Sequence, residues 1–561
     1  MPAFDKSAKE ILSADGGKAM RLIITYCKQT IKRYPKIFLR AMGLIIFITL
    51  LSAFLPYGMR IFLDRVTAEA HYGYAALGIL VFAVYLIMKT FVDIRWYRLL
   101  DELGGRCITD LSVELETAMA ETSLGKIDAE GQGRIKHIMY ADVLDVFRVI
   151  GHHIPTLLGS AAVILASLVL AAFYDAGLTL FIFAALLLGM LISVAGKKII
   201  AAKAGNTNNK LKEHHMLCEQ YVDSVPLVQT NPVLSYFTDK TKKSIADFIA
   251  TSQKEDGVQV FWTEAVSNYH TLFNLALSAF LALPAAGGSI VNLVFFITLS
   301  GIIMAEGQKS QLLIQQIIRA KVSFENVDRL RKLPKRQGAD ELGEIEEVRF
   351  AGVGFTYQEH GEEVLHDVTC KLKKGDSIRL TGGNGSGKST FIKLLTGVYS
   401  PQSGEILVNG KRILSYSKEA LNEQILFLNQ DEVLLDGPVR TYLEIIGGKS
   451  YTPEKAEEAL KWAAWEKEDA VIENGGLSLS AGQRKKLLLA KLLLRYEKAS
   501  VIILDEVEAG LDRDTVHKYM EFLQGVFAKH DKIWILIAHS LNDGLPPMRT
   551  ISFEEGRIRE S

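Results

Sequence analysis

Long stretches without a charged residue alternate with polar segments over the first 306 residues of this 561-residue chain, and the apolar residues thin out afterwards. Six such stretches cover residues 41–59, 72–88, 149–174, 176–196, 265–286 and 289–305. A helix rises about 1.5 Å per residue, so each stretch is close to the length that crosses a hydrocarbon core of roughly 30 Å. The pattern predicts six membrane-spanning helices, because so many runs of this length do not fit a soluble core.

The segments between these stretches differ greatly in length. Short ones follow the first, third and fifth stretches, whereas segments of 60 and 68 residues follow the second and fourth. The long segments and the 1–36 tail are rich in Lys and Arg, which favours the cytoplasmic side. We expect a multi-pass protein of a cell membrane, either a bacterial inner membrane or a plasma membrane. The tail has no cleavable signal, so the first spanning helix is expected to direct insertion.

Two parts of the long segments read as helices outside the bilayer. Residues 106–122 and 207–221 are polar and rich in helix formers, so the spanning helices are expected to continue beyond the membrane. The following turns, 124–134 and 222–229, are candidates for short helices that dock onto the C-terminal half. Plain solvated loops are the alternative.

The second half of the chain reads as a soluble domain. Residues 308–335 are polar and helix-forming, and strand-like alternation begins at residue 347. We therefore divide the chain into a cytoplasmic tail (1–36), a transmembrane domain (37–320), a linker (321–345) and a soluble domain (346–561). Lys plus Arg equals Asp plus Glu at 64 each, so no basic surface field favours nucleic acid. The four cysteines form no CxxC pair, which argues against a disulfide or metal framework.

A glycine-rich motif of the form GxxxxGK[ST] lies between a strand-like run, 377–380, and a helical run, 390–395. The motif and the residue after it are Gly382, Gly383, Asn384, Gly385, Ser386, Gly387, Lys388, Ser389 and Thr390. Glycines let backbone N–H groups surround phosphate oxygens, Lys388 neutralises the β- and γ-phosphates, and Ser389 offers a hydroxyl to Mg²⁺. The motif predicts a binding site for ATP and Mg²⁺.

A second motif supplies two acids. The apolar run 501–504 has the character of a buried parallel strand and ends in Asp505 and Glu506. We expect Asp505 to hold Mg²⁺ through water. Glu506 is then placed to polarise the water that attacks the γ-phosphate, as general base or by positioning it.

Residues 479–483, Leu-Ser-Ala-Gly-Gln, precede these acids and resemble the LSGGQ signature of the ATP-binding-cassette (ABC) superfamily. Further matches follow in the order of that family: Tyr357, Gln430, Leu511-Asp512 and His539. The resemblance implies that Tyr357 stacks on adenine and that Gln430 senses Mg²⁺ and faces the membrane domain. It also implies that Asp512 communicates across a dimer and that His539 contacts the γ-phosphate.

The resemblance extends to the arrangement of the whole chain. Six spans with two long cytoplasmic segments, followed by this cassette, resemble the exporter branch with fused domains. The implied fold is an all-α, six-helix transmembrane domain of the type I exporter kind, followed by an α/β P-loop ATPase domain with a helical subdomain. The implied function is ATP-driven export from the cytoplasm by alternating access. Ser480, Gly482 and Gln483 of one chain would then face the nucleotide on the P-loop of a second half-transporter.

Two positions depart from the family pattern. Ala481 stands where the signature usually has glycine, and residues 508–512 read Glu-Ala-Gly-Leu-Asp in place of the commoner Ser-Ala-Leu-Asp ending. Neither change removes a catalytic group, so we favour a homodimer. Altered signatures also occur in resembling heterodimeric exporters, and a heterodimer stays open.

The cargo is the least determined feature. The glycine-rich loop resembles that of bacterial exporters of modified peptides, so we lean toward a peptide or another amphipathic small molecule as cargo. A lipid, drug, siderophore or thiol exporter and an ATPase-gated channel are the alternatives. Polar residues in or near the spans are candidates for lining a cavity in the lipid-embedded domain, and half of them are expected to serve helix packing instead. These residues are His152, His153, Asn268, His270, Asn274 and Glu306.

Overall fold

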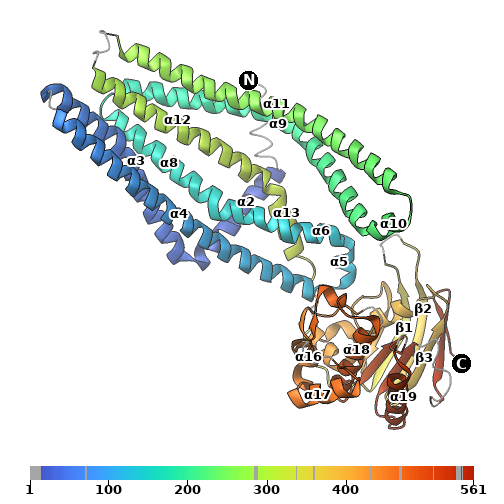
Figure 1. Cartoon of the computed structure of the whole chain (residues 1–561). Coiled ribbons are helices and arrows are strands. Elements are labelled where there is room, and N and C mark those ends of the chain that lie inside the picture. Colours follow the sequence, from blue (N-terminus) through green and yellow to red (C-terminus); the bar gives the residue numbers. More distant parts are fainter. Residues whose placement is uncertain are drawn as a thin grey trace. The chain divides into compact units, whose positions relative to one another are not determined.

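The computed structural model describes most of the chain and divides it into two compact units (Figure 1). The described residues are 14–69, 72–283, 289–335, 338–357, 361–429, 432–466, 470–508, 511–537, 545 and 547–560. Unit 1 consists of the residues up to Val113 together with His137–Asp328, and unit 2 of Glu114–Lys136 with Arg329–Ser561. A short internal segment of the first half of the chain therefore belongs to the same unit as the C-terminal half.

Unit 1 is built from helices. They are α2 (Ala14–Arg33), α3 (Pro35–Glu69), α4 (Tyr72–Glu121), α7 (Val143–Phe147), α8 (Ile154–Ala172), α9 (Ala176–Asp223), α10 (Val225–Thr230), α11 (Leu234–Leu281), α12 (Ile290–Arg319) and α13 (Lys321–Arg331), with α4 and α13 ending in unit 2. Helix α4 has 50 residues, and α9 and α11 have 48 each, far more than the roughly 20 that cross a bilayer. The predicted helical extensions beyond the membrane are confirmed.

Five of these helical stretches are long and apolar enough to cross a membrane. They are Pro35–Val66, Ala76–Glu121, Gly133–Ala172, Ala176–Ser193 and Ile290–Arg331. The predicted fifth stretch, 265–286, lies mostly on α11 and is not among them, and residues 284–286 are outside the described part. Asn268, His270 and Asn274 make α11 more polar than the other spans. A sixth span therefore stays a prediction.

The core of unit 1 joins helices far apart in the sequence. Helices α9 and α11 lie side by side along much of their length, and α8 packs against α3 and α12 (Figure 1). Leu277, Phe295, Leu299 and Ile303 are fully buried in one cluster. Large apolar side chains elsewhere on the spans face outward, including Ile79, Phe91 and Phe173. Lipid is the solvent that accepts such a surface.

The described residues of unit 2 form three sheets, the smallest of which pairs β7 (Gly437–Pro438) with β8 (Val471–Ile472). The largest has the order β12-β11-β3-β10-β9-β6, in which β11, β3, β10, β9 and β6 run parallel to one another. Its strands are β3 (Ser377–Gly382), β6 (Ile425–Leu428), β9 (Val501–Asp505), β10 (Ile533–Ile537), β11 (Arg549–Glu554) and β12 (Arg557–Glu560). The four-stranded antiparallel sheet has the order β2-β1-β4-β5, made of β1 (Glu347–Phe355), β2 (Leu365–Lys373), β4 (Ser403–Val408) and β5 (Lys411–Arg412).

Helices surround these sheets, and two hydrophobic cores hold the domain together. The helices are α5 (Leu124–Glu130), α6 (Gln132–His137), α14 (Lys388–Leu395), α15 (Lys418–Gln424), α16 (Val439–Gly447), α17 (Pro453–Trp462), α18 (Ala481–Arg495) and α19 (Arg513–Phe527), with α6 ending at the start of unit 1. One core joins the two larger sheets around Phe350 and Phe391, and the other joins the helices to the parallel sheet around Tyr442 and Leu487. This is the predicted α/β domain with a helical subdomain.

Candidate functional site

The glycine-rich loop connects β3 to α14, and three of its positions require a residue without a side chain. Gly382, Gly385 and Gly387 have φ values of +144°, +78° and +110°, in the region that favours glycine. A Cβ added to Gly382 would lie 2.5 Å from the Phe553 carbonyl oxygen, and one on Gly387 would lie 2.5 Å from Leu365 Cδ2. The backbone therefore forms a tight turn whose N–H groups are not covered by side chains.

The polar atoms of this loop fit a phosphate group. Lys388 Nζ donates to the carbonyl oxygens of Gly382 and Gly383, at 2.8 and 2.9 Å, so the ammonium lies over the loop. Ser386 Oγ is buried and makes no hydrogen bond within the described part of the chain. Ser389 and Thr390 follow in the first turn of α14, where the helix dipole favours an anion. The residues present match what a nucleotide phosphate requires.

Tyr357 lies beside this loop. Its hydroxyl is 2.9 Å from Thr390 Oγ1, and the residue is 42% exposed. The ring also packs edge-on against Tyr399, with centroids 5.5 Å apart. The hydroxyl contact holds Tyr357 against α14, and its stacking on adenine stays a prediction.

Asp505 is the last residue of β9, and Glu506 follows it. In the sheet, β10 alone separates β9 from β3. Carboxyl ends of parallel strands meet at one edge, so Asp505 reaches the same edge as the glycine-rich loop. Glu506 has a φ of +47°, which is strained for a residue with a side chain. The Glu506 N–H donates to the Ile537 carbonyl at 3.0 Å, and Lys485 Nζ donates to the Glu506 carbonyl at 2.6 Å. Two contacts from other elements thus hold its backbone.

The signature residues begin α18. Ser480 is the N-cap: its hydroxyl accepts a hydrogen bond from Gln483 N at 3.2 Å, and Gln483 Oε1 accepts one from Ser480 N at 3.0 Å. A hydroxyl that accepts in the cap still has its own O–H to donate. Ala481 and Gly482 occupy the first turn of the helix, so alanine suits the position where glycine is usual.

Asp512 caps α19. Both of its carboxylate oxygens accept hydrogen bonds from Thr515, from the backbone N at 2.9 Å and from Oγ1 at 2.8 Å. Lys486 Nζ lies 3.4 Å away. The hydrogen bonds from Thr515, with the Lys486 charge, lower the pKa of Asp512 to about 2.

Two predicted site residues, Gln430 and His539, lie outside the described residues. The strands that precede them, β6 and β10, each end two residues earlier. Both strands run parallel to β9, so their carboxyl ends lie at the edge that carries Asp505. Their predicted roles stay predictions.

Sequence reasoning identified the docking segment 124–134 but missed its partner residues. Helix α5 contacts the cassette within unit 2: Leu124 N donates to the Val398 carbonyl at 3.1 Å, and the Tyr399 hydroxyl donates to Asp128. Burial and this hydrogen bond raise the pKa of Tyr399. The prediction of a docking helix is confirmed here. The second candidate, 222–229, includes part of the short helix α10, whose docking stays untested.

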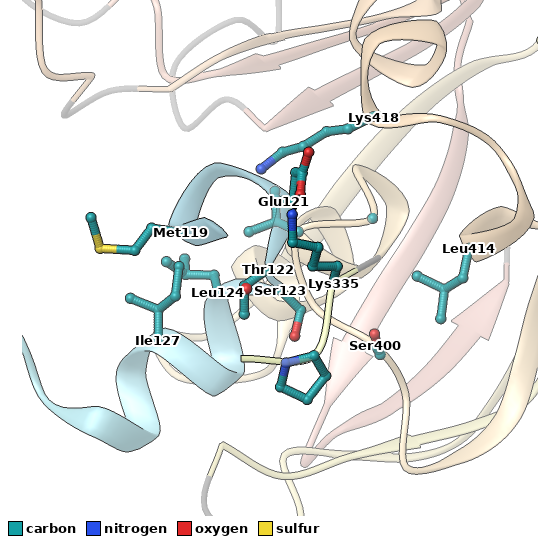
Figure 2. A pocket seen from close by; sticks show the side chains of 13 residues that line it. Met119, Glu121, Thr122, Ser123, Leu124, Ile127, Lys335, Ser400, Leu414 and Lys418 are labelled. Atoms are coloured by element: carbon teal, nitrogen blue, oxygen red, sulfur yellow. Dashed lines mark ion pairs between the residues drawn. The ribbon is translucent and has the colours of Figure 1, made fainter. Parts of the chain in front are cut away.

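A cavity of about 380 Å³ lies beside α5 (Figure 2). Its lining includes Glu121, Lys335 and Lys418, which come from α4, the segment after α13, and α15. Lys335 Nζ pairs with Glu121 at 2.6 Å, and Lys418 Nζ donates to the Ala120 carbonyl at 2.8 Å. These contacts attach the end of α4 to the cassette surface.

Four of the six polar residues predicted to line a membrane cavity separate into two groups, whereas Asn268 is exposed and His153 is half-buried. His270 Nδ1 is 2.7 Å from Gln308 Nε2, Asn274 accepts a hydrogen bond from Ser300, and His152 Nε2 is 3.0 Å from Asp101. These three serve contacts between helices. Glu306 lines a separate cavity in unit 1.

Two family models match this chain. The model of the ABC transporter transmembrane region matches residues 38–306, and the ABC transporter model matches residues 365–509. Together they cover most of the chain, in the order predicted from the sequence.

Individual proteins show the same resemblance. The leukotoxin translocation ATP-binding protein LktB of Pasteurella haemolytica-like sp. (strain 5943B) is 25% identical over 97% of this chain and 78% of its own length, as is LktB of Mannheimia glucosida. The structure of a bacterial Atm1-family ABC exporter with ATP bound has a TM-score of 0.81 at 17% identity, covering 94% of this chain and 95% of that one. At that identity the likeness shows the fold. The chain therefore belongs to the ABC transporters, as an ATP-hydrolysing exporter subunit with its multi-pass membrane domain and ATP-binding cassette fused in one polypeptide.

Proposed function

We propose that two copies of this chain form the working exporter and that each ATP is held between the P-loop of one copy and the signature of the other. The supporting observation is the N-cap of α18. Ser480 Oγ accepts from Gln483 N and keeps its own O–H for donation, at the N-terminus of a 15-residue helix whose dipole favours an anion. A phosphate on a second cassette is the acceptor that this arrangement suits.

Within each site, the residues divide the work. Lys388, the glycine-rich backbone and Ser386 bind phosphate oxygens, and Tyr357 stacks on the base. Ser389, Asp505 and Gln430 would hold Mg²⁺, which supplies charge neutralisation for the departing phosphate. Glu506 orients the attacking water, with His539 beside the γ-phosphate. Two chains then alternate between inward and outward states as the cassettes close and open.

We propose export from the cytoplasm across the cell membrane, with an amphipathic peptide as cargo. The LktB relatives are named for translocation of a leukotoxin, which favours polypeptide cargo over lipids, drugs, siderophores or thiols.

The test is a mixing experiment with the full chain in lipid vesicles. Wild type and Glu506→Gln are co-purified in varied ratios, and transport of labelled peptides is measured with ATP hydrolysis. If one inactive site stops the pair, activity falls as the square of the wild-type fraction. A linear fall would overturn the paired mechanism, and transport by pure Glu506→Gln would identify a gated channel instead. A chain without ATPase activity until a second half-transporter is added would show a heterodimer.

A further inference from the structure

A cavity of about 380 Å³ lies in unit 1 between helices α3, α4, α8 and α12. This volume is within the range of roughly 300–1,000 Å³ typical of small-ligand sites. Apolar and aromatic side chains form much of its wall, including Ile48, Tyr85, Val163 and Ile302. Its charged residues follow the charge-free stretches 72–88 and 289–305, at the ends predicted to be cytoplasmic. A molecule arriving from the cytoplasm or the inner leaflet would meet this cavity first.

Two ion pairs line the cavity. Lys89 Nζ is 2.8 Å from Asp93 Oδ2 on α4, and Lys309 Nζ is 3.5 Å from Glu306 Oε2 on α12. The two positive and two negative charges balance. Ionisable groups in or next to a membrane span are rare, and where they face a cavity they mark a candidate functional site. A cavity without net charge does not select a strongly anionic or a strongly cationic molecule.

Three polar atoms of the lining lack hydrogen-bond partners among the described residues. They are Trp96 Nε1, Ser160 Oγ and Glu306 Oε2. The side chains of Trp96 and Ser160 are only 5% and 2% exposed. Buried polar atoms are nearly always paired, so Trp96 Nε1 and Ser160 Oγ indicate a ligand, whereas Glu306 Oε2 has its ion pair with Lys309 but accepts no hydrogen bond from a described residue. They offer one donor, one hydroxyl that can donate or accept, and one anionic acceptor.

We propose that this cavity binds the amino-terminal end of an amphipathic peptide, with its ammonium on Glu306 and a backbone carbonyl on Trp96 Nε1. The inference rests on the proposed export function and specifies its cargo. A peptide end carries a cation and carbonyl acceptors close together beside apolar side chains, which suits the unpaired indole N–H and hydroxyl, the free hydrogen-bonding capacity of the Glu306 carboxylate and the apolar walls. A hydrophobic cation lacking a carbonyl would leave the indole N–H unpaired, and an anionic thiol could not bind the Glu306 carboxylate.

The first test compares one tripeptide in two forms. Leu-Phe-Leu with free ends and its N-acetylated form are titrated against the full chain in phosphatidylcholine nanodiscs, without ATP. The wild type is expected to bind the free form about tenfold more tightly, since a charged hydrogen bond is lost on acetylation. In Glu306→Gln this preference is expected to fall below about twofold. The inference is overturned if acetylation has no effect on the wild type, or if the preference survives in Glu306→Gln.

A matched pair of carboxylates controls for general effects. Glu264 also lies at the end of a predicted span, on α11, but is exposed and does not line the cavity. Glu264→Gln is expected to keep the tenfold preference. Because the readout is a difference between two peptides in one variant, a modest loss of folded protein does not change it.

A second pair of variants uses two serines of α8. Ser160 and Ser167 are both buried, two turns apart, and neither hydroxyl has a hydrogen-bond partner among the described residues, but only Ser160 lines the cavity. Ser160→Ala is expected to weaken both peptide forms about three- to fivefold, and Ser167→Ala to weaken neither. Equal effects of the two changes would assign both hydroxyls to helix packing and overturn the role of Ser160.

The remaining measurements distinguish peptide binding from lipid binding, and the cavity assignment from the proposed transport function. If phosphatidylethanolamine in the nanodisc abolishes peptide binding and Glu306→Gln restores it, the cavity is a lipid site and the inference fails. If peptide binds as expected but is not moved by ATP hydrolysis, the proposed function fails and the cavity assignment stands. If peptide is transported but Glu306→Gln keeps the acetylation preference, the function stands and the cavity assignment fails.

Discussion

Lys485 Nζ donates a hydrogen bond of 2.6 Å to the main-chain carbonyl of Glu506. The contact joins the signature helix α18 to the residue proposed to orient the attacking water. Lys485 is 7% exposed, and Glu506 is held at a φ of +47° that an unrestrained glutamate avoids. A change in the position of α18 therefore acts directly on the backbone of Glu506.

Replacement of Lys485 by methionine is expected to lower the kcat of ATP hydrolysis by about ten- to hundredfold, because a hydrogen bond from a charged group contributes about 1.5–3 kcal/mol. The affinity for a labelled ATP analogue should change little, since the P-loop is untouched. Lys485→Gln, which keeps a donor, should recover part of the loss. Lys498 donates to the Lys449 carbonyl at the domain surface, and Lys498→Met is the control. An equal loss in nucleotide affinity would indicate a general structural defect.

Tyr399 connects the docking helix α5 to the nucleotide-binding aromatic residue. Its hydroxyl donates to Asp128, and its ring packs against Tyr357. Tyr399→Phe keeps the ring but removes the hydrogen bond, so the amount of peptide transported per ATP hydrolysed should fall by about three- to tenfold. Tyr416 is also buried but donates to the Val408 carbonyl of β4 instead of to α5, so Tyr416→Phe is the matched control. Unchanged coupling in Tyr399→Phe would exclude this route.

Two glycines of the P-loop, Gly383 and Gly387, should differ in how much their replacement by alanine destabilises the protein. Gly387→Ala places a methyl 2.5 Å from Leu365 Cδ2 at a φ of +110°, and the backbone strain alone costs about 1–2 kcal/mol. Gly383→Ala meets nothing within 4 Å. Thermal unfolding of the full chain in detergent should show a lower Tm for Gly387→Ala and little change for Gly383→Ala. Equal Tm values would mean that the loop relaxes to accept the methyl.

Asp512 gives the cassette a defined response to acid. Its folded pKa is about 2, below the ordinary value of 3.8, so the charged form stabilises the fold above that ordinary value. The stabilisation is lost as the pH falls through about 2. Asp512→Ala should cost about 1 kcal/mol at pH 7 through loss of the cap, and Asp512→Asn should cost part of this through loss of the charge.

The measurement is the Tm of the full chain from pH 7 downward. The difference between wild type and Asp512→Asn should shrink below pH 4 and vanish near pH 2. Asp514, in the first turn of the same helix, supplies the control Asp514→Asn. A difference that stays constant with pH would mean that the carboxylate charge does not contribute.

Sequence patterns predicted most of the local structure. The expected strand at 377–380 lies within β3, and the run ending in acids matches β9 up to Asp505. The docking segment at 124–134 contains α5. These features depend on residues adjacent in the chain, whose periodicity and glycine spacing carry the information.

The features that were missed depend on tertiary contact. Glu306 of α12 and Trp96 of α4 line the same cavity. The sequence of neither segment indicates that the two residues lie close together. His270 and Asn274 looked alike as cavity candidates, but helix packing pairs them with Gln308 and Ser300. The sequence around Lys485 is that of an ordinary helix and does not predict its hydrogen bond to the Glu506 carbonyl. Charged residues just beyond the end of a predicted span, such as Lys89 after 72–88, were the signal available.

The balanced ion pairs of the unit 1 cavity have an electrical consequence. Carrying one elementary charge across a membrane at 100 mV involves about 2.3 kcal/mol of work. A peptide with free ends and neutral side chains carries no net charge, and Lys89, Asp93, Glu306 and Lys309 add none to the cavity that holds it. The transport cycle would then be electroneutral for such cargo, and its rate would not depend on whether the cell is energised or depolarised.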